Sequence, residues 1–360
     1  TLLLILGVVI GAFIIANPAA WLIAKCRFPG RNLFQWSLLL PLAMPAYVVA
    51  YVYTDLFDYA GPVQGALRNL FAWQTPHDYY FPEVRSLGGA AIMLALVLFP
   101  YIYLLARTAF MEQSASLAHA ARVMGCTPWK SFWRLSLPMA RPALAVGATL
   151  VAMETAADFA TVSYFAVPTL TTAVYDTWFE YGSLTAAAKL STIMLFVVFA
   201  MVGFERFARR KQQLFQKQSA AGELDYYALS GAKAFAATLY CSALLLLAFI
   251  IPFLILLQYA WDYFAQSWNA KFFEYSLNSL WIALLASVIC VAIGVVLMFV
   301  RRVSPRRADM LPSRLASTGY ALPGTVLAIG ILVPFTLLDF AINDIAKYLN
   351  FEAPGLILTG

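Results

Sequence analysis

The chain alternates between long apolar runs and shorter polar segments. Runs of about 20 apolar residues are long enough to cross the hydrocarbon core of a bilayer as helices. Such runs are expected at 2–24, 33–57, 87–105, 143–162, 186–204, 234–261, 279–300 and 315–338, and a further one opens near 355. The pattern predicts an all-α polytopic membrane protein with about eight spans.

Composition agrees with this prediction. Hydrophobic residues make up 62% of the chain and charged residues 12%, with a mean hydropathy of +0.76. Soluble domains carry about a quarter charged residues, so that class is excluded. The four cysteines show no metal-type spacing, and we expect neither a metal site nor a disulfide. Because the chain starts inside one apolar run and ends at the start of another, we expect it to be a fragment of a longer protein.

Basic residues report the orientation of the spans. If the spans alternate in direction, 19 of the 24 Lys and Arg residues fall on one side of the membrane. The positive-inside rule assigns that side to the cytoplasm. It places segments 111–142 and 207–233 there. The positive net charge is thus explained by short loops between spans, and no nucleic-acid partner is expected.

Two stretches of the chain repeat. Residues 45–51 (PAYVVAY) match 323–329 (PGTVLAI), and the basic turn at 25–31 matches the one at 301–307. Chance similarity between proline-containing apolar runs is the alternative, but the order of turn and span also agrees. The copies run in the same direction, which predicts two parallel halves with a path between them. We expect residues 1–206 to form a first half lacking its first span, 207–233 a linker, and 234–360 the start of a truncated second half.

Segment 119–142 is charged and amphipathic where its neighbours are apolar. Gly125 is expected to end one short helix at its C′ position. Thr127 and Pro128 fit the N-cap and first position of a second helix. The apolar face of that helix would carry Trp129, Phe132, Trp133 and Leu137. Pro138 and Pro142 are expected to break the chain before it re-enters the membrane.

The residues alone leave two interpretations of this segment open. A short helix projecting into the cytoplasm can dock into a separate motor protein. An amphipathic helix can also lie on the bilayer surface, with Trp and Arg side chains at the level of the headgroups.

The spacing of the segment resembles the "EAA" loop of ABC-importer permeases, in which an acidic residue and two alanines precede a glycine and an aliphatic-x-Leu-Pro sequence. Here His119 stands at the acidic position, where a neutral imidazole can only hydrogen-bond. The resemblance implies the type I importer transmembrane fold and a loop that couples the permease to an ATPase. The residues it assigns to coupling are His119, Ala120, Ala121, Gly125, Leu135, Leu137 and Pro138.

Partners follow from the same resemblance. It implies ABC ATPase subunits, as a homodimer, and a periplasmic substrate-binding protein, in a bacterial inner membrane. The chain contains no GxxxxGK[ST] sequence, so ATP and Mg²⁺ are expected on the ATPase and no cofactor or enzymatic activity on this chain.

Glu154 and Asp158 lie four residues apart, which would place them on one face of the fourth span. Ionisable side chains within spans are costly and face the bundle interior or water, so both are candidates to line the path. Alternatively, Asp158 lies at the outer interface and Glu154 pairs with a neighbouring helix. Thr161, Pro45 and Pro323 complete the set of candidate path residues.

Residues 154–165, with the ADFATV sequence, and Thr169-x-Thr171-Thr172 resemble ferric-iron permeases, whose pattern is ADFGTV followed by TxTT. Ala160 replaces the glycine. The resemblance implies ferric iron as substrate, although permeases for thiamine, polyamines and oxyanions share the scaffold. An ion-coupled secondary transporter would suit the acidic span but would leave segment 119–142 unexplained. A membrane-embedded enzyme is disfavoured because neither His77 nor His119 has a metal or triad partner in the sequence.

Overall fold

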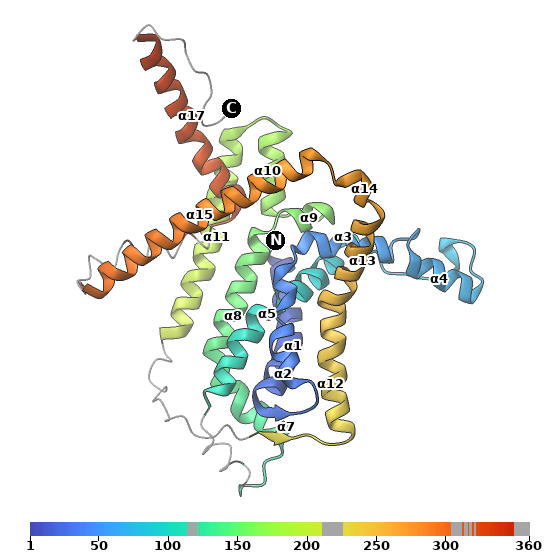
Figure 1. The fold of residues 1–360 in the computed structure, drawn as a ribbon. Coiled ribbons are helices and arrows are strands. Elements are labelled where there is room, and N and C mark those ends of the chain that lie inside the picture. Colours follow the sequence, from blue (N-terminus) through green and yellow to red (C-terminus); the bar gives the residue numbers. More distant parts are fainter. Residues whose placement is uncertain are drawn as a thin grey trace. The chain divides into compact units, whose positions relative to one another are not determined.

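A computed structural model describes residues 1–113, 121, 123–210, 226–303, 312, 316, 319 and 322–348. Helices dominate this part of the chain (Figure 1). Seven of the described helices are long and apolar enough to cross a membrane, or eight spans if one bent pair is counted. The prediction of an all-α polytopic membrane protein with about eight spans is therefore confirmed.

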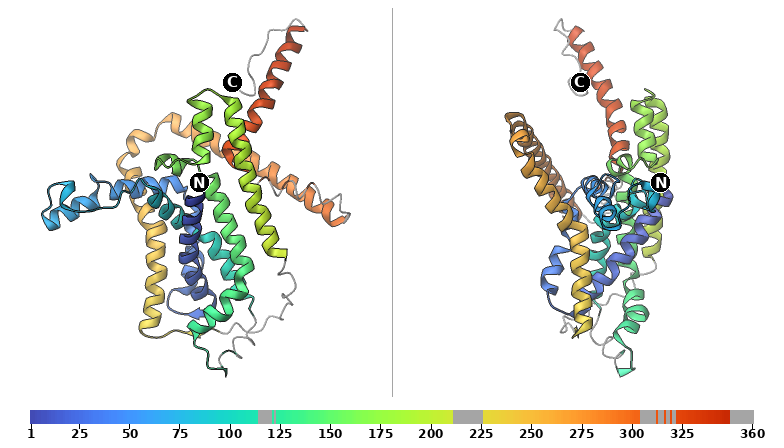
Figure 2. Two further views of the ribbon diagram at one scale, coloured as in Figure 1. Left: turned by 180° about the vertical axis from the view of Figure 1, so that it is seen from behind. Right: turned by 90° about the vertical axis from the view of Figure 1, so that its right-hand side faces the viewer.

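The chain divides into two compact units. One comprises Thr1–Pro252 and the segment from Pro323 on, and the other comprises Phe253–Leu322. In the first unit, α1 (Leu2–Lys25) packs along α5 (Leu87–Met111), and both contact α8 (Leu137–Ala157) (Figure 2). The same unit contains α10 (Leu170–Phe179) and α11 (Leu184–Arg210), which contact α17 (Gly324–Tyr348).

Small residues allow the central helices to approach closely. A Cβ on Gly147 would lie 2.9 Å from Ile102 Cα, and one on Gly11 would lie 3.0 Å from Ala95 Cβ. Helices in a bilayer associate through this kind of backbone approach, because lipid provides no hydrophobic force between them. The helices α1, α5 and α8 therefore form the closely packed centre of the first unit.

The second apolar run is not one straight span. It folds as α2 (Arg31–Ser37), η1 (Leu40–Ala43) and α3 (Ala46–Phe57), with a bend of 91° between the parts before and after Met44-Pro45. Pro45 has no N–H to continue the helix, and Met44 before it adopts an extended conformation (φ −103°, ψ 129°). The expected span over 33–57 is therefore bent at Met44-Pro45, as in a broken span or a re-entrant segment.

Other boundaries shift by several residues. α8 ends at Ala157 rather than near 162. It is followed by the short helix α9 (Ala160–Tyr164). α11 runs on to Arg210, into the segment expected to be the linker. The polar stretch after α3 contains α4 (Pro62–Phe71) and η2 (Pro76–Asp78).

The end of the expected linker packs back onto the first half. β2 (Tyr227–Ala228) pairs in parallel with β1 (Cys26–Arg27), and the Leu229 N–H donates to the Arg27 carbonyl at 3.0 Å. α12 (Ala232–Leu245) then contacts α1 and α2. It continues through a π-helical turn, η4 (Leu246–Ile250), into α13 (Ile251–Asp262).

The second unit contains α14 (Phe264–Ser267) and α15 (Ala270–Val303). α15 contains the whole of the expected run 279–300, and its described side chains are almost all exposed. α15 ends at Val303, inside the basic segment 301–307, and α1 ends at Lys25, the first residue of the basic segment 25–31. Residues 304–307 lie outside the described residues.

Candidate functional site

Gly125 closes a helix turn in the segment expected to couple to an ATPase. Its φ of +74° is left-handed, and the N–H of Cys126 donates to the carbonyl of Ala121 at 2.9 Å. This six-residue bond is characteristic of a Schellman motif, in which glycine occupies C′. The role expected for Gly125 at the end of a helix is confirmed.

The second helix of the segment begins as expected. The Thr127 side chain accepts from the N–H of Lys130, and Pro128 occupies the first position of α7 (Pro128–Ser131). The expected break at Pro138 and Pro142 is wrong, because the helix continues from Pro128 to Ala157.

A π-helical turn explains how the helix passes Pro138. In η3 (Phe132–Ser136), the N–H of Leu137 donates to the carbonyl of Phe132, five residues back. Such a turn shifts the hydrogen-bond register and accommodates a residue without an N–H. The segment and the span are therefore one helix, about 45 Å long at 1.5 Å per residue.

The expected apolar face of this helix is divided. Phe132 is 3% exposed and lies edge to face with Trp21 of α1, with ring centroids 5.5 Å apart. Trp129 and Trp133 are 62% and 51% exposed. Val123 and Met124 in the preceding turn are exposed as well. One side chain thus anchors the helix in the bundle, while its neighbours leave an apolar surface uncovered.

A polar bridge fixes the start of α8 to the end of α5. Gln113 donates from Nε2 to the carbonyl of Ser136 at 2.9 Å, and its own carbonyl accepts from Lys25 Nζ at 3.3 Å. Ala121 is buried, and Leu135, Leu137 and Pro138 are half-buried. His119 and Ala120 lie outside the described residues.

Asp158 lies just beyond the last residue of α8 and caps α9. Its carboxylate accepts from the N–H groups of Thr161 and Val162 at 3.0 and 3.1 Å, and from the Thr161 hydroxyl at 2.9 Å. The Asp158 carbonyl accepts from the Thr171 hydroxyl at 2.8 Å. Asp158 is also the C-cap of α8, and its N–H donates to the Glu154 carbonyl at 3.0 Å, so the two acidic residues lie one helical turn apart at the end of the same helix. The two threonines of the ferric-permease-like sequence thus converge on this aspartate.

Glu154 lies in the last turn of α8 and is half-buried. Its carboxylate accepts from the hydroxyl of Tyr101 on α5 at 3.4 Å. Pairing with a neighbouring helix was one of the two readings left open by the sequence, and this contact is of that kind. A path role for Glu154, Asp158 and Thr161 stays a prediction.

Pro45 and Pro323 occupy equivalent places in the repeat. Each immediately precedes a helix and supplies its first carbonyl acceptor, to Val48 N–H at 3.0 Å in α3 and to Leu327 N–H at 3.0 Å in α17. Pro45 is exposed and Pro323 is buried. The repeat found in the sequence therefore has a counterpart in local structure.

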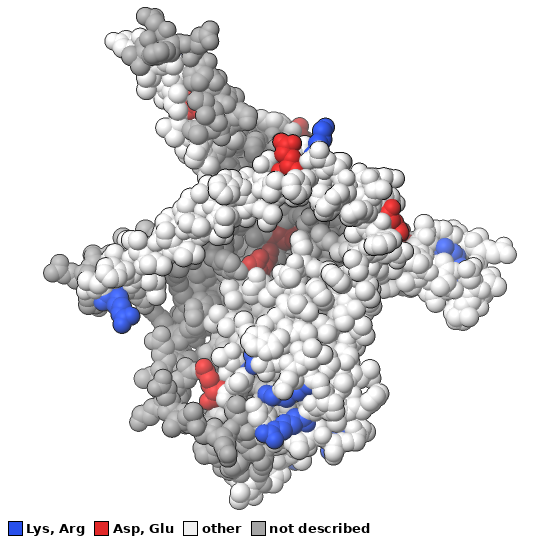
Figure 3. Space-filling model, in the orientation of Figure 1, with Lys and Arg blue, Asp and Glu red and all other residues white. Residues whose placement is uncertain are grey.

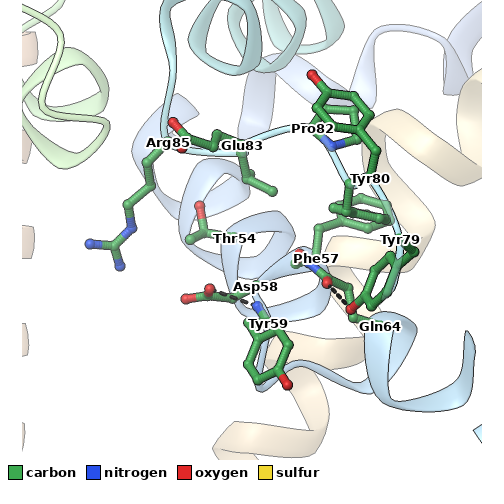
Figure 4. A pocket seen from close by; sticks show the side chains of 12 residues that line it. Thr54, Phe57, Asp58, Tyr59, Gln64, Tyr79, Tyr80, Pro82, Glu83 and Arg85 are labelled. Atoms are coloured by element: carbon green, nitrogen blue, oxygen red, sulfur yellow. Dashed lines mark hydrogen bonds between the residues drawn. The ribbon is translucent and has the colours of Figure 1, made fainter. Parts of the chain in front are cut away.

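The polar stretch between α3 and α5 forms a pocket of about 530 Å³ that the sequence did not reveal (Figure 4). α3 supplies Thr54 and Phe57, and the residues before α5 supply Glu83 and Arg85. A buried glutamine, Gln64, donates from Nε2 to the Phe57 carbonyl at 2.8 Å and accepts from the Tyr79 hydroxyl on its own side-chain oxygen.

Further bonds stiffen the wall of this pocket. Arg68 donates from Nη1 to the Tyr59 carbonyl at 2.8 Å and to the Tyr79 hydroxyl at 3.1 Å. Asp78 accepts from the backbone N–H groups of Thr75 and Gln74, which lowers the pKa of its carboxyl group. Tyr79 is thus a wall residue of the pocket that is held by hydrogen bonds to Gln64 and Arg68.

Comparison with known proteins decides the family. The family described as binding-protein-dependent transport system inner membrane component matches residues 16–213, more than half of the chain. The chain belongs to this family. It is therefore an ABC-importer permease with the type I transmembrane fold. The matched region includes the Gly125 turn, the helix from Pro128 to Ala157 and the Asp158 cap.

Three relatives show the range of the family. An Fe(3+)-transport system permease protein of Haemophilus influenzae is 26% identical over 215 residues, which cover 60% of this chain and 38% of the relative. A molybdenum transport system permease protein of Escherichia coli is 29% identical over 49% of this chain and 76% of its own length. A sulfate transport system permease protein of Escherichia coli is 27% identical over 53% of this chain and 69% of its own length. The chain thus spans well under half of the length of its ferric relative.

Proposed function

We propose that this permease forms the path of an ATP-driven importer whose substrate is delivered by a periplasmic binding protein. The observation that carries the proposal is the unbroken helix from Pro128 to Ala157. One end presents the exposed Trp129 and Trp133, and the other carries Glu154. A helix moves as a rigid element, so a displacement at its exposed end reaches the acidic end.

The motor in this proposal is a pair of identical ATPase subunits. They bind ATP and Mg²⁺ and hydrolyse the nucleotide, while this chain performs no chemistry. The uncovered apolar surface of Val123, Met124, Trp129 and Trp133 is the docking surface for one of them. Because Phe132 is buried against Trp21, closure of the ATPases displaces the helix together with its contact on α1.

Orientation is part of the proposal. Segments 111–142 and 207–233 face the cytoplasm of a bacterial inner membrane, in agreement with the distribution of Lys and Arg. Among the described residues of the first unit, basic side chains gather at the end of the bundle that carries α2 and α7 (Figure 3). The pocket between α3 and α5 then faces outward. Its exposed rim, with Tyr80 91% exposed, is the surface on which the binding protein docks.

Ferric iron is the proposed substrate. The similarity to the Fe(3+) permease covers 60% of this chain, and the sequence from Glu154 to Thr172 resembles that group. Carboxylates such as those of Glu154 and Asp158 attract a cation and repel an oxyanion. Hard oxygen donors also suit a hard cation.

Molybdate and sulfate are the rival substrates, because permeases for both are similar to this chain. Uptake of labelled ferric iron, molybdate and sulfate by cells with and without the intact gene separates them, with thiamine as a further control. Gene-dependent uptake of iron alone supports the proposal. Gene-dependent uptake of an oxyanion overturns the substrate and leaves the coupling role standing.

Co-purification tests the coupling role separately. The intact permease, purified with its ATPase, should lose the partner when Trp129 and Trp133 are both replaced by Ser. Replacement of the exposed Tyr80, in the pocket rim between α3 and α5, is the matched control and should leave ATPase binding unchanged. Retention of the ATPase by the double variant would disprove the docking surface.

A further inference from the structure

A second pocket, of about 410 Å³, lies where the basic turn after α1 meets the start of β2. Its walls come from residues almost 200 positions apart in the sequence. They are Arg27, Phe28, Gly30, Arg31, Asn32, Leu33 and Tyr226. None of these residues belongs to the helix that runs from Pro128 to Ala157, and the proposed function does not use the pocket.

Tyr226 holds two guanidinium groups together. The Arg31 guanidinium lies 4.4 Å from the Tyr226 ring centroid and donates from Nη2 to its hydroxyl at 3.2 Å. Arg31 also donates from Nε to the Ile23 carbonyl at 2.8 Å. The guanidinium of Arg27 lies 5.0 Å from the same centroid. Arg31 is thereby fixed, whereas Arg27 is exposed and retains its hydrogen-bond donors.

The two positive charges have no acidic partner in the part of the chain that the structure describes. Like charges this close repel each other, and an anion between them removes that repulsion. A phosphate group suits the site, because guanidinium donors match phosphate oxygens in geometry and charge. The amide of Asn32 and the hydroxyl of Tyr226 add polar groups to the same wall.

The surface beside the pocket is apolar. Leu33 and Trp36 of α2 are each 66% exposed, and Leu40 of η1 is 41% exposed. A soluble anion would make no contact with such an apolar surface, whereas the acyl chains of a lipid would pack against it. Basic pockets between spans at the cytoplasmic side are typical of anionic headgroup binding, and Trp is common at the interface level.

We propose that this pocket binds the headgroup of an anionic phospholipid, with the phosphate between Arg27 and Arg31 and the acyl chains along Leu33 and Trp36. The lipid then stabilises the contact that joins the basic turn of the first half to the strand leading into α12. The choice of the inner leaflet rests on the proposed orientation. Binding itself does not depend on substrate or ATPase.

The test uses the purified full chain in detergent, titrated with phosphatidylglycerol and, separately, with phosphatidylcholine. Native mass spectrometry counts the bound lipids, and thermal unfolding reports their effect on stability. Phosphatidylglycerol should bind and raise the unfolding temperature, while phosphatidylcholine does neither. Arg27→Gln should weaken binding about fivefold, the effect of about 1 kcal/mol per basic residue. Lys233→Gln, an exposed basic residue of α12 outside the pocket, is the matched control and should change binding by less than half as much.

Three results would overturn the proposal. Equal binding of both lipids would show that the charges are not used. Displacement of the lipid by inorganic phosphate would indicate a phosphate site without a role for the acyl chains. Binding seen only in Asp225→Asn, where the carboxylate next to Tyr226 in the sequence is removed, would show that the chain itself neutralises the arginines. Since no transport is measured, a failure here is distinct from a failure of the proposed function.

Discussion

Phe132 lies edge to face with Trp21, with ring centroids 5.5 Å apart and ring planes at 62°. Phe132 belongs to segment 119–142 and Trp21 to α1, and the ring centroids of Trp21 and Tyr227 of β2 lie 6.2 Å apart. This contact therefore joins segment 119–142 to both the first span and the strand that leads into α12. Phe132 thus anchors the helix in the bundle, whereas its neighbours Trp129 and Trp133 stay exposed on the same helix.

Phe132→Ala should lower both stability and coupling. Truncation of a buried Phe costs about 3 to 5 kcal/mol of unfolding free energy in protein cores. We expect a clearly lower unfolding temperature in detergent, together with ATP hydrolysis that no longer drives uptake. Trp129→Ala removes an equally large ring that is 62% exposed and should leave the unfolding temperature nearly unchanged. Equal losses of stability in the two variants would contradict the division of the helix face.

Substitutions at Gly125 should act through the backbone alone. A Cβ there would meet no atom within 4 Å among the described residues, so steric clash is not the cause. A left-handed conformation costs an ordinary L-residue about 1 to 2 kcal/mol, and Asn tolerates it best. ATPase co-purification should therefore fall in the order Gly, Asn, Ala, Val. Full binding by the Val variant would show that this turn plays no part in docking.

The sequence predicted the spans well, because their length and composition are set by the bilayer. It predicted the Gly125 turn and the Thr127-Pro128 start for the same kind of reason, since these depend on neighbouring residues only. The consequences of proline were harder to predict. Pro45 breaks its run, whereas Pro138 lies within a continuous helix because the π-helical turn before it changes the hydrogen-bond register.

Contacts between residues far apart in the sequence could not be predicted from the hydrophobic pattern. The pocket around Tyr226 needs Arg31, which is 195 positions away. The Glu154–Tyr101 bond crosses from α8 to α5. The spacing placed Glu154 and Asp158 one helical turn apart, but it did not show that α8 ends between them, with Asp158 as its C-cap. Where it ends depends on the Asp158 cap and on Thr171, which approaches from a later segment.

The substitution Asp158→Asn removes the negative charge of the side chain but keeps its ability to cap α9. An Asn oxygen can accept the N–H groups of Thr161 and Val162 as the carboxylate does, and Asn and Asp are about equally good caps. The unfolding temperature should stay near that of the wild type, while ferric uptake falls if the negative charge lines the path. Asp158→Ala should lose about 1 kcal/mol of stability through the missing cap. Normal uptake by the Asn variant would restrict Asp158 to a structural role.

Cysteine labelling tests the orientation and the packing of the basic turn together. Cys126 follows the Gly125 turn and is half-buried, whereas Cys26 of β1 is fully buried, and burial raises its pKa from 9.0 to about 12. At about pH 7.5 almost no Cys26 thiolate forms. Only above about pH 9 does ionisation of this thiol begin to favour the unfolded chain, because the folded thiol holds its proton more tightly.

In single-cysteine variants, a membrane-impermeant maleimide should label Cys126 in inside-out vesicles and not in right-side-out vesicles. Cys26 should stay unlabelled in both until the protein is unfolded. Labelling of Cys126 in right-side-out vesicles would reverse the proposed orientation, and rapid labelling of native Cys26 would contradict the packing of β1.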